Sequence, residues 1–142
     1  MPVVNLDAIP QVVLPFMNED HREEARLLNE ACDAAKGHLA GTVPVETVLH
    51  RLEALFQHTE EHFGRENEAM QRASFPPYPV HRGEHDRVLE ELESEEVHFR
   101  ETGDTKRLLK YLSEAVPAWF TAHIQSMDAI TAQWVTARSG GA

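Results

Sequence analysis

The chain has 142 residues, of which 42% are hydrophobic, and its formal net charge is −11. This length fits one domain with a continuous core, and the composition excludes an intrinsically disordered chain. The acidic balance argues against binding to nucleic acid or to an anionic membrane, because both surfaces require clustered Lys and Arg.

The first 16 residues are apolar, but Pro2, Pro10 and Pro15 interrupt them and they carry no basic start. This is not the pattern of a secretory signal peptide. No apolar run approaches the ~20 residues that cross a bilayer, so we expect no membrane association. Cys32 is the only cysteine, which excludes an internal disulfide and a cysteine-rich zinc site. These features predict a cytoplasmic protein with Cys32 in its core.

An N-terminal arm, residues 1–17, comes first, and its prolines disfavour a helix. We expect the first helix to begin at Asn18, because an asparagine side chain can accept hydrogen bonds from the N–H groups of a first turn. Gly41 and Pro44 mark the end of this helix. Steps of three and four residues predict one apolar stripe, made of Ala25, Leu28, Cys32, Ala35 and Leu39.

Two further helices, residues 45–73 and 80–100, are expected on either side of the proline-rich segment 75–79. Both have an inward face that mixes apolar and ionisable residues. The predicted face of the second helix is Val48, Leu52, Leu55, Thr59, His62, Glu66, Ala69 and Ala73. The predicted face of the third is His81, His85, Val88, Leu89, Leu92 and Phe99.

A fourth helix is expected after Asp104, its predicted N-cap. Pro117 lies inside this helix and predicts a kink or a short break, and residues 138–142 are expected to form a flexible tail. Four helices with short connections predict an all-α, up-down-up-down antiparallel four-helix bundle over residues 18–137. The predicted inward stripe of the fourth helix is Leu108, Leu112, Ala115, Trp119, His123, Met127, Ile130 and Trp134.

Histidines and carboxylates recur on these inward faces at short spacings. Two pairs are four residues apart, so their side chains are roughly 6 Å apart along a helix and on nearly the same side of it. Such groups are costly to bury unless they have partners, and they are ligands for transition metals. Seven donors exceed the four of a tetrahedral ion and therefore predict a pair of metal ions. The candidate ligands are His21, His62, Glu66, His81, His85, His123 and Asp128.

The order of these segments resembles the hemerythrin family, specifically the bacterial single-domain, HHE cation-binding hemerythrins. Residues 62–70, HFGRENEAM, are similar to the family's HFxxE segment with its following methionine. Residues 78–85 contain a Tyr-Pro pair and an HxxxH segment, and residues 119–128 contain an HxxxxD segment. His21 takes the remaining place, so the resemblance extends from about residue 16 to residue 135.

The resemblance implies a non-haem di-iron centre that binds O2 reversibly, in a protein of oxygen storage, delivery or sensing rather than an enzyme. The implied cofactor is two Fe ions joined by two carboxylates and an oxo or hydroxo bridge. O2 would bind at the iron that has only two histidines and keeps an open position. The implied ligands are His81, His85 and His123 on one iron, His21 and His62 on the other, and Glu66 and Asp128 as bridges.

The chemistry of the donors favours the same function. Ferritin-like di-iron sites are rich in carboxylates, whose anionic oxygens stabilise high-valent iron. A site dominated by neutral imidazoles should stabilise high-valent iron less, and should therefore hold O2 rather than cleave it. We expect apolar neighbours to keep water from the bound ligand; they are Leu28, Leu55, Val88, Phe120 and Ile124.

Two other functions remain open at this point. The vacant coordination position also suits a di-iron enzyme that acts on peroxide or nitric oxide, although no general acid is evident in the sequence. An iron or redox sensor would require a protein partner, and none is evident either.

Several polar residues near the candidate ligands allow more than one interpretation. His58 precedes His62 by four residues and forms a competing pair, but the family pattern favours His62 with Glu66. Glu24 follows His21 by three residues, and we expect it to be solvated or to support a ligand. Both tryptophans are expected to pack in the core. The remaining histidines are expected to lie outside the site; they are His38, His50 and His98.

Overall fold

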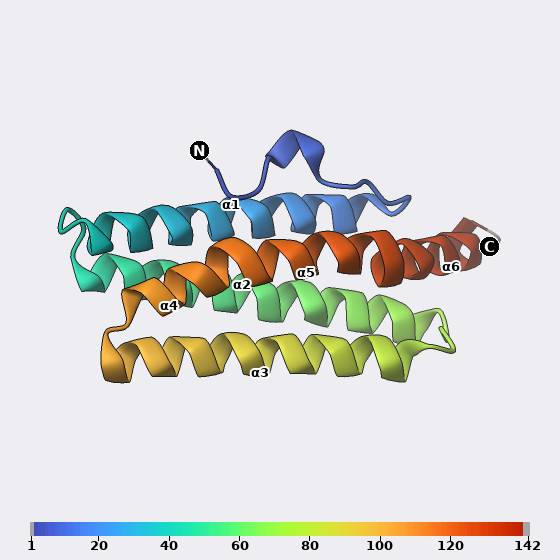
Figure 1. Ribbon diagram of the computed structural model, residues 1–142. Coiled ribbons are helices and arrows are strands. Elements are labelled where there is room, and N and C mark those ends of the chain that lie inside the picture. The colour runs from blue at the N-terminus through green and yellow to red at the C-terminus, as the bar shows by residue number, and fades with distance from the viewer. Residues whose placement is uncertain (1, 141–142) are drawn as a thin grey trace.

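The computed structural model describes residues 2–140, in which four long helical rods run antiparallel to their neighbours (Figure 1). The first three rods are α1 (Pro15–Leu39), α2 (Val45–Arg72) and α3 (Tyr78–Thr102). No strand occurs in the described part of the chain. The predicted all-α four-helix bundle is therefore confirmed.

The fourth rod changes its helical type twice along its length. Two π-helical turns join three α-helical segments, so the rod stays continuous through Pro117; of the predicted kink or short break, the break is not found. The wider turn before Pro117 leaves room for its ring, which in an α-helix clashes with the carbonyl four residues earlier. In chain order the segments are α4 (Thr105–Lys110), η2 (Tyr111–Ala115), α5 (Val116–His123), η3 (Ile124–Asp128) and α6 (Ala129–Gly140).

The π turns also move the buried stripe of the fourth rod. Each turn contains one residue more than an α-helical turn, so the inward face shifts by one position. Ala115 and Ile130 were predicted to face inward but are exposed. Thr131 and Ala132 are buried instead. Leu39, predicted on the stripe of α1, is also exposed, at 47% of its surface.

The helix ends differ from the predicted ones where the arm meets the bundle. α1 begins at Pro15, whose fixed φ suits the first helical position, so the arm ends three residues earlier than predicted. Asn18 does not cap the helix, since its side chain pairs with the backbone N–H and C=O of Val12 at 2.9 and 2.8 Å. Asp104 does cap α4, by accepting from the N–H of Arg107. α6 extends to Gly140, beyond the predicted start of a tail, and residues 141–142 lie outside the described residues.

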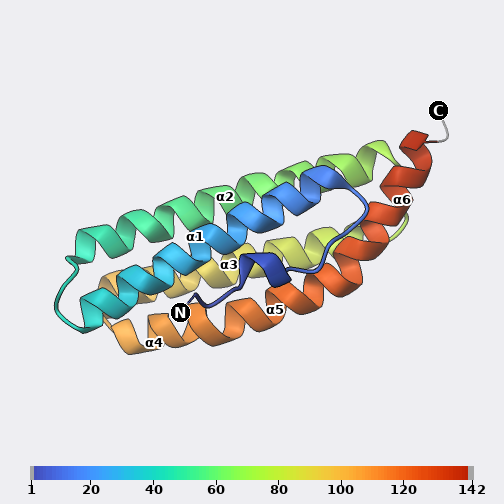
Figure 2. The same ribbon diagram turned by 90° about the horizontal axis from the view of Figure 1, so that it is seen from above.

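Two asparagines of α1 hold the arm against the bundle. Asn29 pairs with the backbone N–H and C=O of Val4, both at 2.8 Å, as Asn18 does with Val12. The two asparagines are eleven residues apart, about three turns, and therefore lie on the same face of α1. Figure 2 shows the arm, with the short 3-10 helix η1 (Leu6–Ala8), lying over α1 and α5. The arm thereby covers a second apolar cluster, made of Ile9, Val12, Met17, Ala25, Phe120, Ile124 and Ala132.

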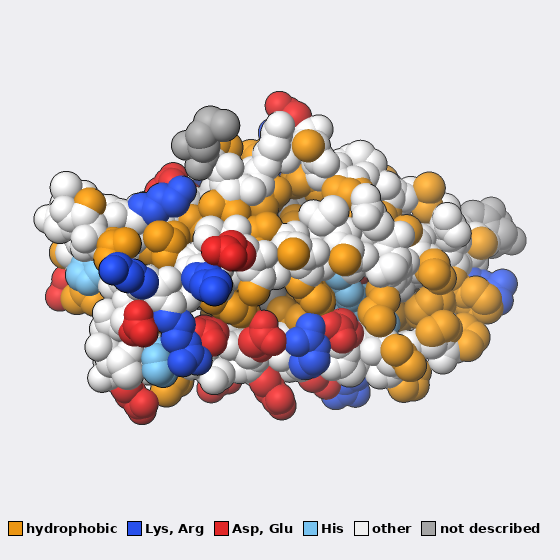
Figure 3. All heavy atoms as spheres, viewed as in Figure 1, with side chains coloured by type: hydrophobic (Ala, Val, Ile, Leu, Met, Phe, Trp, Pro, Cys, Tyr) orange, Lys and Arg blue, Asp and Glu red, His pale blue; other side chains and the backbone are white. Residues whose placement is uncertain are grey.

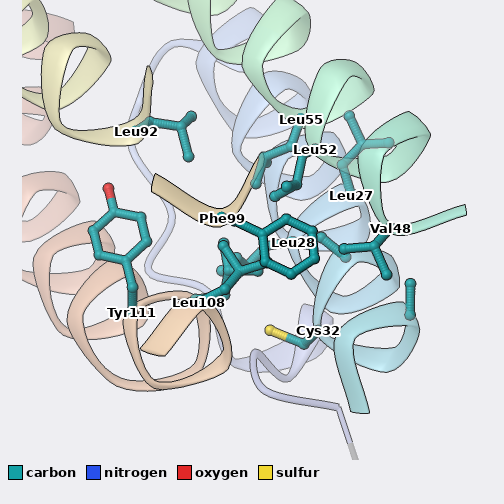
Figure 4. Packing of buried hydrophobic residues seen from close by; sticks show 13 residues of the cluster. Leu27, Leu28, Cys32, Val48, Leu52, Leu55, Leu92, Phe99, Leu108 and Tyr111 are labelled. Carbon is teal, nitrogen blue, oxygen red and sulfur yellow. The ribbon is translucent and has the colours of Figure 1, made fainter. Parts of the chain in front are cut away.

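The main apolar core fills the half of the bundle near the α1–α2 and α3–α4 connections (Figure 4). Its side chains come from all four rods and include Cys32, which is fully buried as predicted. Other members are Leu28, Leu52, Leu55, Leu92, Phe99, Leu108 and Leu112. This half closes by apolar burial alone.

The surface carries mixed charge. Figure 3 shows acidic and basic side chains side by side over α3 and α4, where Arg107 contacts Glu95 at 3.1 Å and Arg87 contacts Glu91 at 3.0 Å. Exposed pairs of this kind contribute little to stability. In the described part of the chain, no helix combines the length and the apolar character that crossing a membrane requires.

Candidate metal centre

The other half of the bundle buries the seven polar side chains that the sequence analysis selected. None of them is more than 5% exposed, and they come from all four rods. The structure therefore brings all seven predicted residues to one place: His21, His62, Glu66, His81, His85, His123 and Asp128.

Helix geometry places each pair of side chains. His62 with Glu66 on α2, and His81 with His85 on α3, use the four-residue spacing of an α-helix. The five-residue spacing of His123 and Asp128 would put them about 140° apart on an α-helix. The π turn η3 lies between them and has five-residue hydrogen bonding, so both side chains face the interior. His123 Nε2 is 3.1 Å from an oxygen of Asp128 as a result.

The donor atoms of these seven residues form two groups that share a carboxylate, and a third group of possible ligands, Glu24, His58 and His62, adjoins them. One group is Glu66, His81, His85, His123 and Asp128, and the other is His21, His62 and Glu66. Within each group the candidate ligand atoms lie within 4.8 Å of one another. Three histidines thus stand on one side of the shared carboxylate and two on the other.

Both carboxylates span the two groups with their two oxygens. Glu66 places Oε1 3.2 Å from His85 Nε2 and Oε2 2.7 Å from His62 Nε2. Asp128 places Oδ1 3.1 Å from His123 Nε2 and Oδ2 2.9 Å from His21 Nε2. This is the arrangement that bridging ligands between two cations require.

Several donor atoms lack the partners that buried polar atoms need. Among the described residues, Glu66 Oε1, Asp128 Oδ1 and His85 Nε2 are buried and accept or donate no hydrogen bond. His81 Nε2 and His123 Nε2 face each other at 3.1 Å, although only one of them could carry a hydrogen for the other. Cations between these atoms would satisfy all of them, so the residues present fit a pair of metal ions.

The pKa values of both carboxyl groups are lowered, so they are ionised, as ligands of a cation need to be. Burial raises the pKa of Glu66, but the surrounding histidines, His62 most strongly, hold it well below its ordinary value. Burial and Glu66 raise the pKa of Asp128, and contacts with His123 and His21 outweigh them and lower it. Burial lowers the pKa of His85, which favours the neutral form that binds metal.

A surrounding layer of residues fixes the imidazole rings. His81 donates from Nδ1 to the Thr131 hydroxyl at 2.8 Å. His85 donates from Nδ1 to the Asn67 side-chain oxygen at 2.9 Å. In both rings Nε2 is left to face the centre, which is how metal-binding histidines are oriented.

Aromatic rings clamp two of the same imidazoles. Phe63 stacks on His85 with centroids 4.0 Å apart and an interplanar angle of 5°. Trp119 stacks on His123 at 4.4 Å and 19°. Trp119 therefore supports the site directly, although the sequence analysis predicted only core packing.

Four further supporting residues were not selected from the sequence, or were left open. Glu24 is buried, which decides between the two interpretations given for it. Thr59, Asn67 and Thr131 also touch site residues. Three of the four are three residues away from a candidate ligand on the same helix, and that spacing is the signal that could have found them. His58 lies beside this layer, with Nε2 3.1 Å from the carbonyl of Asp20.

An apolar cavity of about 30 Å³ adjoins the centre on one side. Of the five site histidines only His62 lines it; His21, His81, His85 and His123 are not among its lining residues. Four of the five predicted apolar neighbours line it: Leu28, Leu55, Val88 and Phe120. The fifth, Ile124, is buried in the cluster under the arm instead.

Comparison with known proteins gives the family of this chain. Residues 12–135 match the hemerythrin HHE cation binding domain. The chain belongs to the hemerythrin family. It is 31% identical over 138 residues to a bacteriohemerythrin of Ralstonia nicotianae, with 97% of this chain and 93% of that protein covered. It is 29% identical over 118 residues to a bacteriohemerythrin of Aquifex aeolicus, with 83% and 86% covered.

Membership of this family agrees with the buried cluster. The hemerythrin HHE domain binds metal cations, and this member has a cluster of histidines and carboxylates that fits two of them. The predicted resemblance is therefore confirmed, whereas the predicted cytoplasmic location stays a prediction.

Proposed function

We propose that this hemerythrin binds two iron ions through the seven buried side chains and holds O2 reversibly on one of them, without turning it over. His81, His85 and His123 would hold one ion, and His21 and His62 the other. Glu66 and Asp128 would bridge the pair, with an oxo or hydroxo group as the third bridge.

The observation that carries the proposal is the position of the cavity. It is lined by His62 and by Glu24, which contacts His62; His62 belongs to the group with two histidines, where an ion would have fewer protein ligands and more room for an exogenous one. A volume of about 30 Å³ exceeds the roughly 10–15 Å³ that one water-sized molecule occupies, so a diatomic molecule fits.

The chain's own residues would protect the bound ligand. Leu28, Val88 and Phe120 present carbon to the cavity, which disfavours water and the protons that would release the ligand as a reduced product. A pair of ferrous ions, held by these seven residues, would supply the two electrons that reversible O2 binding uses. The five imidazoles are neutral donors and stabilise high-valent iron less than carboxylates would, which favours holding O2 over cleaving it.

The test is reversibility. The protein is loaded with ferrous iron under nitrogen, exposed to air, and purged again while its visible spectrum is followed. We expect an absorption band that appears with air and disappears on purging, with two irons per chain. His62→Ala should abolish the band, and His38→Ala, outside the cluster, should leave it unchanged.

Other outcomes would point elsewhere. Irreversible oxidation without a reversible band would contradict O2 storage or delivery. Turnover of peroxide or nitric oxide faster than by free iron would instead favour the enzymatic alternative.

A further inference from the structure

Glu24 is a buried carboxylate beside the centre that is not one of the seven candidate ligands. Only 8% of its surface is exposed, and an ionised group in that position requires partners. Its Oε1 lies 3.3 Å from His62 Nδ1, and its Oε2 accepts from the Thr59 hydroxyl. Both contacts reach across from α1 to α2, so Glu24 is held on the outer side of the His62 ring.

The site histidines differ in what their outward nitrogens meet. His85 and His81 donate to neutral oxygens, an amide and a hydroxyl. His21 Nδ1 is buried and has no hydrogen-bond partner among the described residues. His62 alone among these four has a carboxylate there. A carboxylate that accepts from a metal-bound imidazole raises the basicity of the ring and makes it a stronger donor.

The sequence spacing explains how the two helices build this contact. His21 and Glu24 are three residues apart on α1, and Thr59 and His62 are three apart on α2. Each helix therefore contributes one candidate ligand and one supporting residue on the same face. The contact occurs on the two-histidine side of the cluster, where Glu24 also lines the apolar cavity.

We infer that Glu24 is a positioning residue: it holds the His62 ring with Nε2 toward the ion at the two-histidine side and strengthens that imidazole as a donor. The inference rests on the proposed function, since it assumes that His21 and His62 share an ion. It gives the two ions unequal supporting groups, a charged one at His62 and neutral ones at His81 and His85. The ion next to the cavity would have two histidine ligands, whereas the other would have three. The hydrogen bond from His62 to the Glu24 carboxylate would compensate in part for the missing histidine by making His62 a stronger donor.

Glu24→Gln separates charge from shape. The glutamine oxygen can still accept from His62 Nδ1, and its amide can donate to Thr59, whose hydroxyl then bonds the Leu55 carbonyl, now 2.7 Å away. Glu24→Ala removes both the charge and the contact. Asn67→Ala is the matched control, because it removes the corresponding partner of His85.

The experiment measures Zn²⁺ binding to metal-free protein by chelator competition, so that no O2 chemistry enters. We expect one of the two ions to bind about 10- to 100-fold more weakly in Glu24→Ala and less weakly in Glu24→Gln, with the other ion unchanged. In zinc-loaded protein labelled with ¹⁵N in histidine, Glu24→Gln should shift the His62 resonances and Asn67→Ala those of His85.

Equal weakening of both ions, or unchanged binding in both Glu24 variants, would overturn the role of Glu24. A shift at His85 instead of His62 in Glu24→Gln would do the same. If the unaltered protein fails to bind two equivalents, the proposed function itself fails. The two failures are therefore distinguished by the stoichiometry of the unaltered chain.

Discussion

The two halves of this bundle close in different ways. Near the α1–α2 and α3–α4 connections, Leu52, Leu108 and Leu112 meet in a core with no buried carboxylate. In the other half the same four rods meet around five imidazoles and two carboxylates, beside the apolar cluster under the arm. The backbone geometry is shared, so the difference lies in which side chains the helices turn inward.

The two halves differ in whether their stability depends on bound ions. Apolar burial is favourable by itself, at about 25 cal/mol per Å². Buried carboxylates such as Glu66 and Asp128 are costly unless cations or hydrogen bonds compensate them, and one oxygen of each has no such partner within the described residues. The apolar half should therefore fold by itself, whereas the polar half should require its ions.

Removal of the metal should give the largest effect. For each ion present at 1,000 times its dissociation constant, the loss should be about 4 kcal/mol of the free energy of unfolding. Hydrogen exchange measured with and without chelator should show faster exchange around His85 and His123 than around Leu52. Equal acceleration of hydrogen exchange in both halves would contradict the inference that only the polar half depends on the ions.

The next largest effect on stability should come from a substitution that creates a cavity in the apolar half. Leu52 is 1% exposed, and Leu52→Ala should lower the free energy of unfolding by about 2–5 kcal/mol. Urea denaturation of the metal-loaded protein measures this loss. The variant should still bind two ions, because Leu52 does not touch the cluster; loss of one ion would show that the halves are coupled.

Across the pH range in which the histidines titrate, the dependence of stability on pH should have opposite signs with and without metal. Burial lowers the pKa of His21 and His62, but Asp128 and Glu66 outweigh it at His21, and Glu66 and Glu24 outweigh it at His62, so both are raised. In metal-free protein their contribution is present below the ordinary pKa of 6.5 and is lost as the pH rises through the raised values. Metal-loaded protein should instead lose stability as the pH falls, because protons compete with the ions for the imidazoles.

The buried carboxylates determine how the metal-free protein loses stability at low pH. The lowered pKa of Glu66 gives stability above its ordinary value of 4.5, and this is lost as the pH falls through the folded value. Metal-free protein should therefore be most stable between the carboxyl and histidine ranges. Urea midpoints measured across pH, with and without chelator, would show the two profiles; identical profiles would mean that no ion binds the cluster.

The smallest effect concerns a thiol of the apolar half. Burial raises the pKa of Cys32 to about 11, so at neutral pH it remains a protonated thiol that thiolate-directed reagents do not modify. A colorimetric thiol assay should detect it only after denaturation, with or without metal. If Cys32 reacted in the presence of chelator alone, without denaturant, the apolar half would have to open when the ions leave.

Helical periodicity was enough to predict much of the fold. Steps of three and four residues predicted most of the buried positions of α1 and α2, although not Leu39, and Pro and Gly predicted their connections. The pattern failed in the fourth rod, where Ile130 was placed inward and is 58% exposed. A periodicity of 3.6 residues has no means to register a π turn, which adds a residue and shifts every later position.

The candidate site was likewise predicted in part. Spacing and residue type selected the seven side chains that the structure brings together. The five-residue interval between His123 and Asp128 was the one sign that the helix between them is not α-helical. Supporting residues such as Glu24 and Thr131 were missed or left open, because a carboxylate or hydroxyl three residues from a candidate ligand is equally consistent with a solvated position.

The sequence by itself determined an all-α bundle and the chemical types of the donors, because periodicity, prolines and residue chemistry are local properties of the chain. Only the tertiary structure decided that Glu66 and Asp128 each span two groups of histidines, and that the cavity adjoins His62. Those facts depend on how four rods lie against one another, and distances between rods are set by side-chain packing that no interval along the chain encodes.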